Sequence, residues 1–463
     1  MSVVIHIAFV AWFLATLALF WTRPPREALV ASLVTGWLFL PVAGYSVTGL
    51  HSKSEIVGTG VLVASLLLAL EPWRRFRPSL FDLPVLVACL TPIASSITND
   101  LGYYNAGSDV LARALRWGVP YLLGRIYLSD LRGLKTIAMG AFLGGLAYVP
   151  LCLIEIRVSP QLHRFFYGYH QHEFVQTIRW GGFRPMVFMQ HGLAVGMWMT
   201  AACLAGFWLW YSGGRRRIAG VPVHLLLGIL VITTLLVKSA GSLILLAVGV
   251  AALLLARTFR TSLPVLVLLL VAPTYIAARA TGWWSGREMV EMSSRFDLER
   301  GASLRTRLEN EDELVQRAMQ KKAFGWGGWG RAEIKDEEGR STSVRDGQWV
   351  IVVGESGLVG LIALNTLFLL PVIVLGWRYR GRLWHDPALA PAAVIAVLLP
   401  VVVIDSLLNA FGAPLFTTST GAVLGFALSR PTRGRRRRVA SPGWADGPSS
   451  QGIPLAPRPR LPR

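Results

Sequence analysis

Charged side chains are scarce in this sequence: Asp, Glu, Lys and Arg make up only 16% of its 463 residues. Soluble proteins carry about 25%, and 53% of this chain is hydrophobic, so a water-soluble fold is excluded. Cysteine is scarcer still. Cys89, Cys152 and Cys203 all fall inside apolar segments, where a thiol behaves as a small hydrophobe, and we expect no disulfide framework.

Long apolar runs are abundant instead. A membrane-spanning helix needs about 20 mostly apolar residues. The first run has no basic flank and no small-residue cleavage pattern, so we expect no cleaved signal peptide. The predicted fold is an all-α polytopic integral membrane protein with about 12 or 13 transmembrane helices, near residues 3–21, 27–47, 56–71, 79–97, 109–128, 133–155, 185–211, 219–237, 239–256, 262–279, 348–377, 388–408 and 412–429.

The net charge of +20 comes from basic residues that recur in alternate turns. The positive-inside rule assigns such turns to the cytoplasm. The intervening turns near 48–55, 98–108 and 409–412 hold one lysine among them, so the charge indicates topology rather than nucleic-acid binding. We expect a multi-pass protein of the cell inner membrane with its N-terminus outside and its C-terminus cytoplasmic. The marking residues are Arg23, Arg26, Arg74, Arg75, Arg77, Arg132, Lys135, Arg215–Arg217, Arg257, Arg260, Arg378, Arg380, Arg382 and the tail from Arg433.

This topology places two long polar loops outside, at residues 156–184 and 280–347. The second is nearly neutral, with 12 Lys plus Arg against 13 Asp plus Glu, as expected for a small folded element. Within it, Ser303–Ala323 has apolar residues at helical spacing, which predicts an amphipathic helix on the membrane surface. The domain order is N-terminal helices 1–108, central helices 109–279, the large loop 280–347, C-terminal helices 348–429 and a disordered basic cytoplasmic tail 430–463.

Several motifs follow one another along the large loop: Arg307, Ala318, Phe324-Gly-Trp-Gly, Asp346-Gly-Gln-Trp-Val and Glu355-Ser-Gly-Leu-Val-Gly-Leu. Their order resembles the periplasmic loop of the O-antigen ligase and O-antigen polymerase superfamily. The resemblance covers roughly residues 110–430. It extends to Tyr121-Leu-Leu-Gly-Arg125, to Gly181-Gly-Phe-Arg-Pro through His191-Gly-Leu, and to Ser239-Ala-Gly-Ser.

The resemblance implies an architecture like the GT-C type of membrane glycosyltransferase. It also implies a metal-independent, inverting reaction that polymerises or ligates glycans outside the inner membrane during surface polysaccharide biosynthesis. The donor would be a glycan linked to undecaprenyl diphosphate, and the acceptor a hydroxyl of a glycan or of a lipid A core-like glycolipid. Because the diphosphate already activates the donor, neither nucleotide nor other cofactor is expected. Two positions depart from the family: its usual His is Asp346 here, and the Arg often found after the Ser is Ala240, with Lys238 nearby.

Arginines are the expected contacts of the departing diphosphate, because a guanidinium binds phosphate oxygens bidentately and keeps its charge. The resemblance assigns this catalytic role to Arg184 and Arg307. The alternatives are a headgroup-facing loop arginine and a helix charge paired with Glu311. Arg113 and Arg116 lie inside an apolar segment, where ionisable residues favour substrate binding, although snorkelling to the interface would also explain them.

Asp346 could replace the family's His as catalytic base, or cap the helix that begins near Gln348. The resemblance also implies substrate contacts for His191, Gln348, Trp349 and Glu355, although a hydrogen-bonded interior histidine remains an alternative for His191. The Gly354, Gly357 and Gly360 series favours close helix packing. Tyr169-His-Gln-His-Glu173 is better interpreted as a polar loop than as a metal site, Asp405 is left outside the site, and the tryptophans of 325–330 suit membrane anchors better than sugar stacking.

A lipid-linked oligosaccharide flippase or other transporter is the alternative function. It would also be all-helical with arginines inside the membrane. Transporters usually place polar groups on broken helices near the midplane and contain internal repeats. Here the candidate residues gather toward the outer end and no repeat is evident in the sequence, so glycan transfer is the preferred interpretation.

Overall fold

A computed structural model describes residues 3–44, 50, 52–214 and 216–429; the predicted disordered tail and Arg215 lie outside these residues. The N-terminal half contains α1 (Val3–Thr22), α2 (Pro25–Phe39), α3 (Lys53–Leu68), α4 (Glu71–Arg75), η2 (Leu80–Asp82), α5 (Leu83–Thr98), α6 (Gly102–Arg113), η3 (Ala114–Gly118), α7 (Val119–Tyr127), α8 (Leu131–Arg157), α9 (Leu162–Tyr167) and η4 (Phe174–Thr177).

Two small hairpins, β1–β2 (Ile178–Arg179 and Gly182–Phe183) and β3–β4 (Arg217–Ile218 and Val221–Pro222), are the sheets of the described chain. The remaining helices are α10 (Gly192–Tyr211), α11 (Val223–Leu236), α12 (Ala240–Phe259), α13 (Leu263–Ala280), α14 (Arg287–Phe296), α15 (Leu298–Met319), α16 (Gln348–Tyr379), α17 (Arg382–His385), η5 (Pro387–Leu389), α18 (Ala390–Asp405) and α19 (Pro414–Leu428).

Eight helices of the described chain are long and apolar enough to cross a membrane. The protein is therefore an all-α, multi-pass membrane protein. Each of the thirteen predicted segments contains helix, but two of them are shorter apolar helices, α11 and α19. Three others, the segments of α2, α3 and α6–η3–α7, are short or interrupted. The eight lie at Val3–Thr22, Leu80–Thr98, Leu131–Arg157, Gly192–Tyr211, Ala240–Phe259, Leu263–Ala280, Gln348–Tyr379 and Pro387–Asp405.

The most buried helices are α10, α18 and α19, whose side chains are enclosed by the others almost throughout. Glycines allow α7 and α19 to pack backbone to backbone. A Cβ at Gly124 would lie 2.1 Å from the Thr418 carbonyl oxygen, and one at Gly421 would lie 2.0 Å from that of Tyr121. Such small-residue contacts are typical of helices packed within a membrane.

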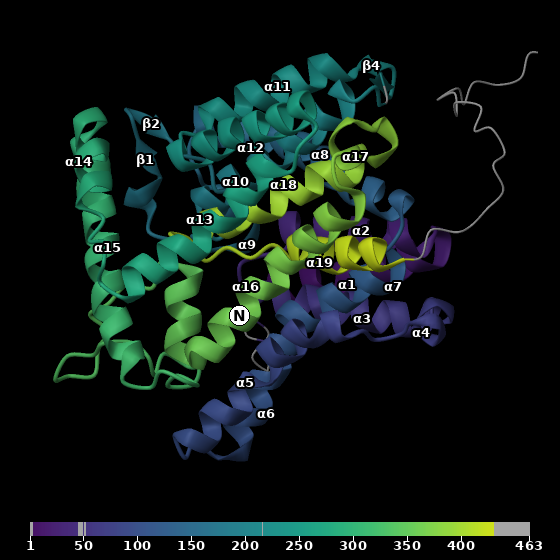
Figure 1. Ribbon diagram of the computed structural model, residues 1–463. Helices are drawn as coiled ribbons and strands as arrows, with labels where there is room; N and C mark the ends of the chain where they lie inside the picture. Colours follow the sequence, from purple (N-terminus) through teal and green to yellow (C-terminus); the bar gives the residue numbers. More distant parts are fainter. Residues whose placement is uncertain (1–2, 45–49, 51, 215, 430–463) are drawn as a thin grey trace, which may run out of the picture. The chain divides into compact units, whose positions relative to one another are not determined.

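The two long polar loops lie on one face, as the alternation of basic turns predicts. Arg179 of the first loop forms an ion pair of 2.6 Å with Glu299 of the second, and the Trp180 indole donates to Asp297 at 3.1 Å. Helices α14 and α15 pack against each other and stand beside the β1–β2 hairpin (Figure 1). The predicted loop helix is α15, which begins five residues earlier than expected because Asp297 caps it through two backbone N–H groups. We call this side the loop face.

Candidate functional site

The helix after the large loop is broken. Helical hydrogen bonding continues from Gln348 to Tyr379, but Gly357 has φ 63° and ψ −165°, which divides α16 into a short first piece and a long second piece. This backbone region is essentially restricted to glycine. A Cβ at Gly357 would also lie 2.2 Å from the Ala323 carbonyl oxygen. The prediction that Gly357 serves helix packing is therefore wrong: it makes the break.

The loop segment 322–327 fills this break. Trp326 and Gly327 donate backbone N–H bonds to the carbonyls of Gly354 and Glu355, at 2.8 and 3.0 Å. In return, the N–H groups of Leu358 and Val359 donate to Lys322 and Ala323, at 2.8 and 3.2 Å. The break thus has its backbone groups paired, as burial requires, and it fixes Glu355 at the edge of a cavity.

A cavity of about 170 Å³ lies beside the first piece of α16. That is many times the roughly 10–15 Å³ that one water molecule needs. Its polar lining comes from α3, from α6 with the following π-helical turn η3, and from α16. Single π-helical turns occur frequently at functional sites. The polar and aromatic lining residues are Glu55, Asp109, Arg113, Arg116, Trp117, Trp329, Gln348 and Glu355.

Both predicted membrane arginines are paired inside this cavity. Arg113 lies 3.0 Å from Glu355, and Arg116 lies 2.9 Å from Glu55, whose side chain is only 1% exposed. Arg345 adds a longer contact of 3.7 Å to Glu355. These partners, rather than snorkelling, account for the two arginines. Glu55 was missed by sequence reasoning, although two intramembrane arginines imply buried carboxylates nearby.

Arg307 and Asp346 are brought together at the loop face. Arg307 Nε lies 3.4 Å from the Asp346 carboxylate, and its Nη1 donates to the Leu408 carbonyl at 2.7 Å. The alternative partner, Glu311, is instead buried against Arg279 at 2.6 Å. The capping alternative for Asp346 is wrong as well: Gly347 is the N-cap of α16, and no side chain caps it.

The segment 406–413 between α18 and α19 connects the predicted residues. The Asn409 side chain accepts from Arg307 Nη1 at 3.3 Å and donates to Asp405 at 2.9 Å. Asp405 is thus linked to Arg307 by hydrogen bonds through Asn409. The Asn409 carbonyl also accepts the N–H of Gln348, at 3.1 Å. Farther along, Phe411 stacks on His191. Asn409 thus joins Arg307 to the cavity residue Gln348, a link that no sequence motif indicates.

Arg184 belongs to a group of cations on the loop face. Its Nη2 donates to the Lys238 carbonyl at 3.0 Å, and its buried Nε has no partner among the described residues. Burial, together with the neighbouring charges of Arg179, Arg300 and Arg307, lowers the pKa of Arg184 to about 10. A side chain this buried does not fit the alternative of a loop arginine that faces the lipid headgroups. We call these five cations the loop-face cluster: Arg179, Arg184, Lys238, Arg300 and Arg307.

His191 is a buried helix cap just before the span Gly192–Tyr211. Its Nδ1 accepts the N–H of Leu193 at 3.0 Å, which caps α10, and its Nε2 lies 3.4 Å from the Gln176 side-chain oxygen. Burial, with added repulsion from His172 and nearby arginines, lowers the pKa of His191 to about 3. The imidazole is therefore neutral at physiological pH. His191 fits the alternative of a hydrogen-bonded interior histidine.

Acid should destabilise the protein through His191. The unfolded histidine takes up a proton below about pH 6.5, whereas the folded one resists protonation down to about pH 3. Stability is thus complete above pH 6.5 and falls as pH decreases toward 3. His191→Asn retains a good cap without titrating, so its melting temperature should fall less between pH 7 and pH 5 than that of the wild type. Parallel pH profiles for the two proteins would contradict this assignment.

Trp349 lies away from the cavity, in a buried network. Its indole donates to Glu311 at 3.2 Å, and Tyr275 donates to the same carboxylate at 3.1 Å. Arg279 completes the network with a second ion pair of 2.7 Å to Asp312. The network joins α13, α15 and α16, and it holds α15 in place one helical turn beyond Arg307. Trp349 is thus structural here, and sequence reasoning missed the role of Arg279 and Glu311.

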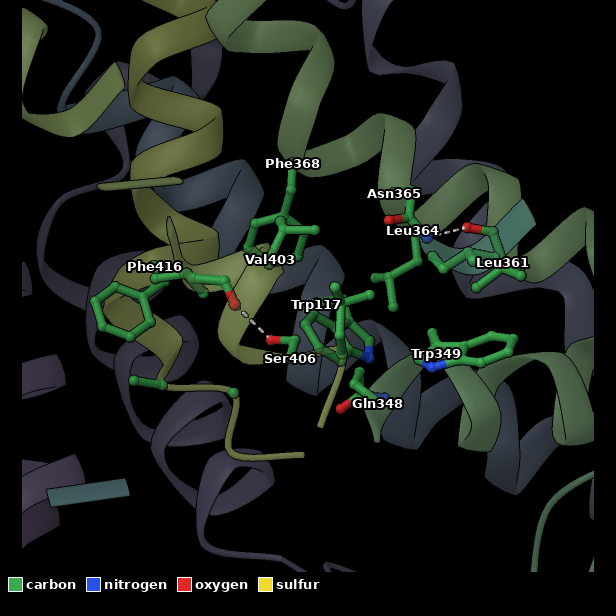
Figure 2. A pocket seen from close by; sticks show the side chains of 15 residues that line it. Trp117, Gln348, Trp349, Leu361, Leu364, Asn365, Phe368, Val403, Ser406 and Phe416 are labelled. Carbon is green, nitrogen blue, oxygen red and sulfur yellow. Dashed lines mark hydrogen bonds between the residues drawn. The ribbon is translucent and has the colours of Figure 1, made fainter. Parts of the chain in front are cut away.

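A smaller, mostly apolar pocket of about 40 Å³ adjoins the cavity. Figure 2 shows Trp117 and Gln348 on one side of it and mostly aliphatic and aromatic side chains of α16, α18 and α19 around the rest, together with the polar Asn365 and Ser406. Trp117, Gln348 and Leu364 line both spaces. Gln348 therefore stands where the polar cavity meets an apolar compartment.

The histidine loop and the loop tryptophans complete the predicted features. His170 bonds to the Pro160 carbonyl and His172 to Gln176; the described chain contains no group of three His, Cys, Asp or Glu side chains that could hold a metal ion. The two loop tryptophans differ. Arg317 Cζ lies 3.5 Å from the centre of the Trp326 ring, whereas Trp329 lines the cavity.

Comparison of the sequence with models of known protein families and with curated proteins finds no match.

Proposed function

We propose that this protein transfers or polymerises glycans from an undecaprenyl-diphosphate-linked donor to a hydroxyl of a glycan or glycolipid. In this proposal all thirteen segments cross the inner membrane, the N-terminus lies outside, and the loop face is the outer face. The observation that carries the proposal is the Arg307–Asp346 ion pair, in which an arginine of the loop-face cluster meets a carboxylate two residues before the cavity residue Gln348. The resemblance to O-antigen ligases and polymerases adds support.

The reaction is a single displacement that inverts the anomeric carbon. The acceptor oxygen forms a bond to that carbon while the bond to the diphosphate oxygen breaks. Asp346 takes the hydroxyl proton, and undecaprenyl diphosphate leaves with the electron pair. Charge develops on the leaving diphosphate, and fixed cations placed there stabilise the transition state. Arg307 and Arg184 suit this task, because each already donates to a neutral backbone carbonyl that a phosphate oxygen can replace.

One observation favours the flippase alternative: α16 is a broken helix, as many transporters have. Transporters use unwound backbone groups to hold ions or substrates. In this break, however, the carbonyls of Gly354 and Glu355 and the N–H groups of Leu358 and Val359 are all bonded to the segment 322–327. The break therefore anchors a loop, which fits a fixed catalytic platform better than an alternating gate.

The test uses the purified protein, an undecaprenyl-diphosphate-linked oligosaccharide and a panel of glycan and glycolipid acceptors. Release of undecaprenyl diphosphate and product size are followed together. A ladder of products would indicate a polymerase, and a single addition would indicate a ligase. Movement of the donor across vesicle bilayers without bond cleavage would refute transfer and support the flippase.

Asp346→Asn should reduce turnover by about 10²–10⁴-fold, the usual contribution of a general base. Asparagine keeps an oxygen for Arg307 but cannot accept the acceptor's proton. Asp336→Asn is the matched control, because Asp336 pairs with Arg340 in the same loop, outside the site, and it should retain full activity. Wild-type turnover in Asp346→Asn would remove Asp346 from the chemistry.

A further inference from the structure

The cavity and the loop-face cluster differ in charge. Three carboxylates and two arginines line the cavity. Both arginines face a carboxylate at 2.9–3.0 Å. The loop-face cluster holds five cations. Three of them pair with acids, Arg179 with Glu299, Arg300 with Asp297 and Arg307 with Asp346, whereas the most buried, Arg184, bonds to a backbone carbonyl. Of the two places, the cluster has the excess positive charge that a diphosphate requires.

A phosphate group is poorly suited to the cavity for a second reason. To bind Arg113 or Arg116 bidentately, it would have to displace Glu355 or Glu55. The carboxylate left behind would then lose its closest cation, and Glu55 is almost fully buried. Removing the cation from a buried carboxylate is strongly unfavourable. The displaced carboxylate would also repel the incoming anion.

An uncharged sugar fits the same lining well. Carboxylates accept hydrogen bonds from hydroxyl groups while guanidinium N–H groups donate to them, so paired acids and arginines offer both kinds of partner without surplus charge. Trp117 and Trp329 supply aromatic surface to the same cavity, and the electron-rich ring face attracts the weakly positive C–H groups of a sugar ring. Trp329 is 53% exposed, which leaves its ring accessible to a ligand.

We propose that this cavity binds an uncharged sugar of the acceptor glycan, while the donor's diphosphate binds at the loop-face cluster. The assignment rests on the proposed function and gives each substrate its own site. Gln348 lies at the junction: it lines the cavity and follows Asp346 by two residues. Its N–H donates to the Asn409 carbonyl, and the Asn409 side chain accepts from Arg307. A sugar in the cavity therefore lies beside Gln348, two residues from the base, and the diphosphate contacts Arg307, the ion-pair partner of Asp346.

The test measures binding alone, with purified protein in lipid nanodiscs, because detergents with sugar headgroups would compete. The probes are methyl glycosides of glucose, galactose, mannose and N-acetylglucosamine, followed by saturation-transfer NMR, and inorganic pyrophosphate, followed by calorimetry. Trp329→Ala should weaken glycoside binding about tenfold, as loss of one aromatic contact can, and leave pyrophosphate binding unchanged. Arg307→Ala should do the reverse. Trp283→Ala, an exposed tryptophan of the same loop, should change neither.

Three results would overturn the assignment: no glycoside binds at millimolar concentration, pyrophosphate displaces a bound glycoside, or Trp329→Ala weakens pyrophosphate binding instead. Glu55→Gln provides a second check, because loss of the partner of Arg116 should raise pyrophosphate affinity and lower glycoside affinity. These readouts do not depend on catalysis. Glycoside binding without release of undecaprenyl diphosphate would refute the proposed function alone, and transfer activity without glycoside binding in the cavity would refute this assignment alone.

Discussion

Gly357→Ala is expected to prevent stable folding. Alanine is strained at φ 63° and ψ −165°, and its Cβ would lie 2.2 Å from the Ala323 backbone oxygen. The oxygen belongs to the segment that fills the break, so it cannot move without loss of the four backbone bonds there. Strain and clash together should cost about 3 kcal/mol or more. Membrane yield and the thermal midpoint of the purified protein measure the effect.

Gly228→Ala is the matched control. Gly228 lies inside α11, and a Cβ there would meet no atom within 4 Å. Alanine is the better helix former by about 1 kcal/mol, so this variant should be as stable as the wild type or slightly more stable. If Gly357→Ala melted at the same temperature as Gly228→Ala, the break in α16 would be wrong.

Arg307→Ala is expected to lower turnover by about 10²–10³-fold, as loss of one oxyanion-stabilising group typically does. The guanidinium lies 3.4 Å from Asp346 and belongs to the loop-face cluster around Arg184. Its loss removes a positive charge that stabilises the leaving diphosphate and the ion-pair partner of the base. The measurement is the rate of undecaprenyl diphosphate release at saturating donor. The thermal midpoint of the same sample shows whether folding is retained.

Arg305→Ala serves as the control for this variant. Arg305 lies on the same helix two residues away and is exposed, so its loss changes the net charge equally without touching the site. Its turnover should match that of the wild type. Equal activity in Arg305→Ala and Arg307→Ala would exclude Arg307 from catalysis.

Much of the architecture follows from the sequence alone, because membrane insertion depends on local hydropathy. Each predicted segment contains helix, and the pattern of basic turns correctly groups the two long loops. The internal irregularities could not be predicted in this way. The π-helical turn at Ala114–Gly118 and the break at Gly357 depend on packing against other segments. A glycine at position 357 is compatible with a continuous, closely packed helix and with a broken helix. The sequence does not distinguish the two.

The sequence predicted several residues of the candidate site but not the partners to which they bond. Arg184, Arg307 and Asp346 do gather at the loop face. Their partners were missed because Glu55, Asn409 and Arg279 come from distant segments, and a single sequence contains no pairing information. The intramembrane arginines did indicate that carboxylates must lie nearby, since isolated charges are costly there. Assigning particular partners requires the fold.

The most direct test of the account is the ratio of undecaprenyl diphosphate released to glycosidic bonds formed, measured with the purified protein and a defined lipid-linked oligosaccharide. An inverting single displacement predicts one diphosphate released for each new bond, with inverted anomeric configuration in the product and loss of both signals in Arg307→Ala. Donor that crosses the bilayer intact, with no diphosphate released and no bond formed, would contradict the account.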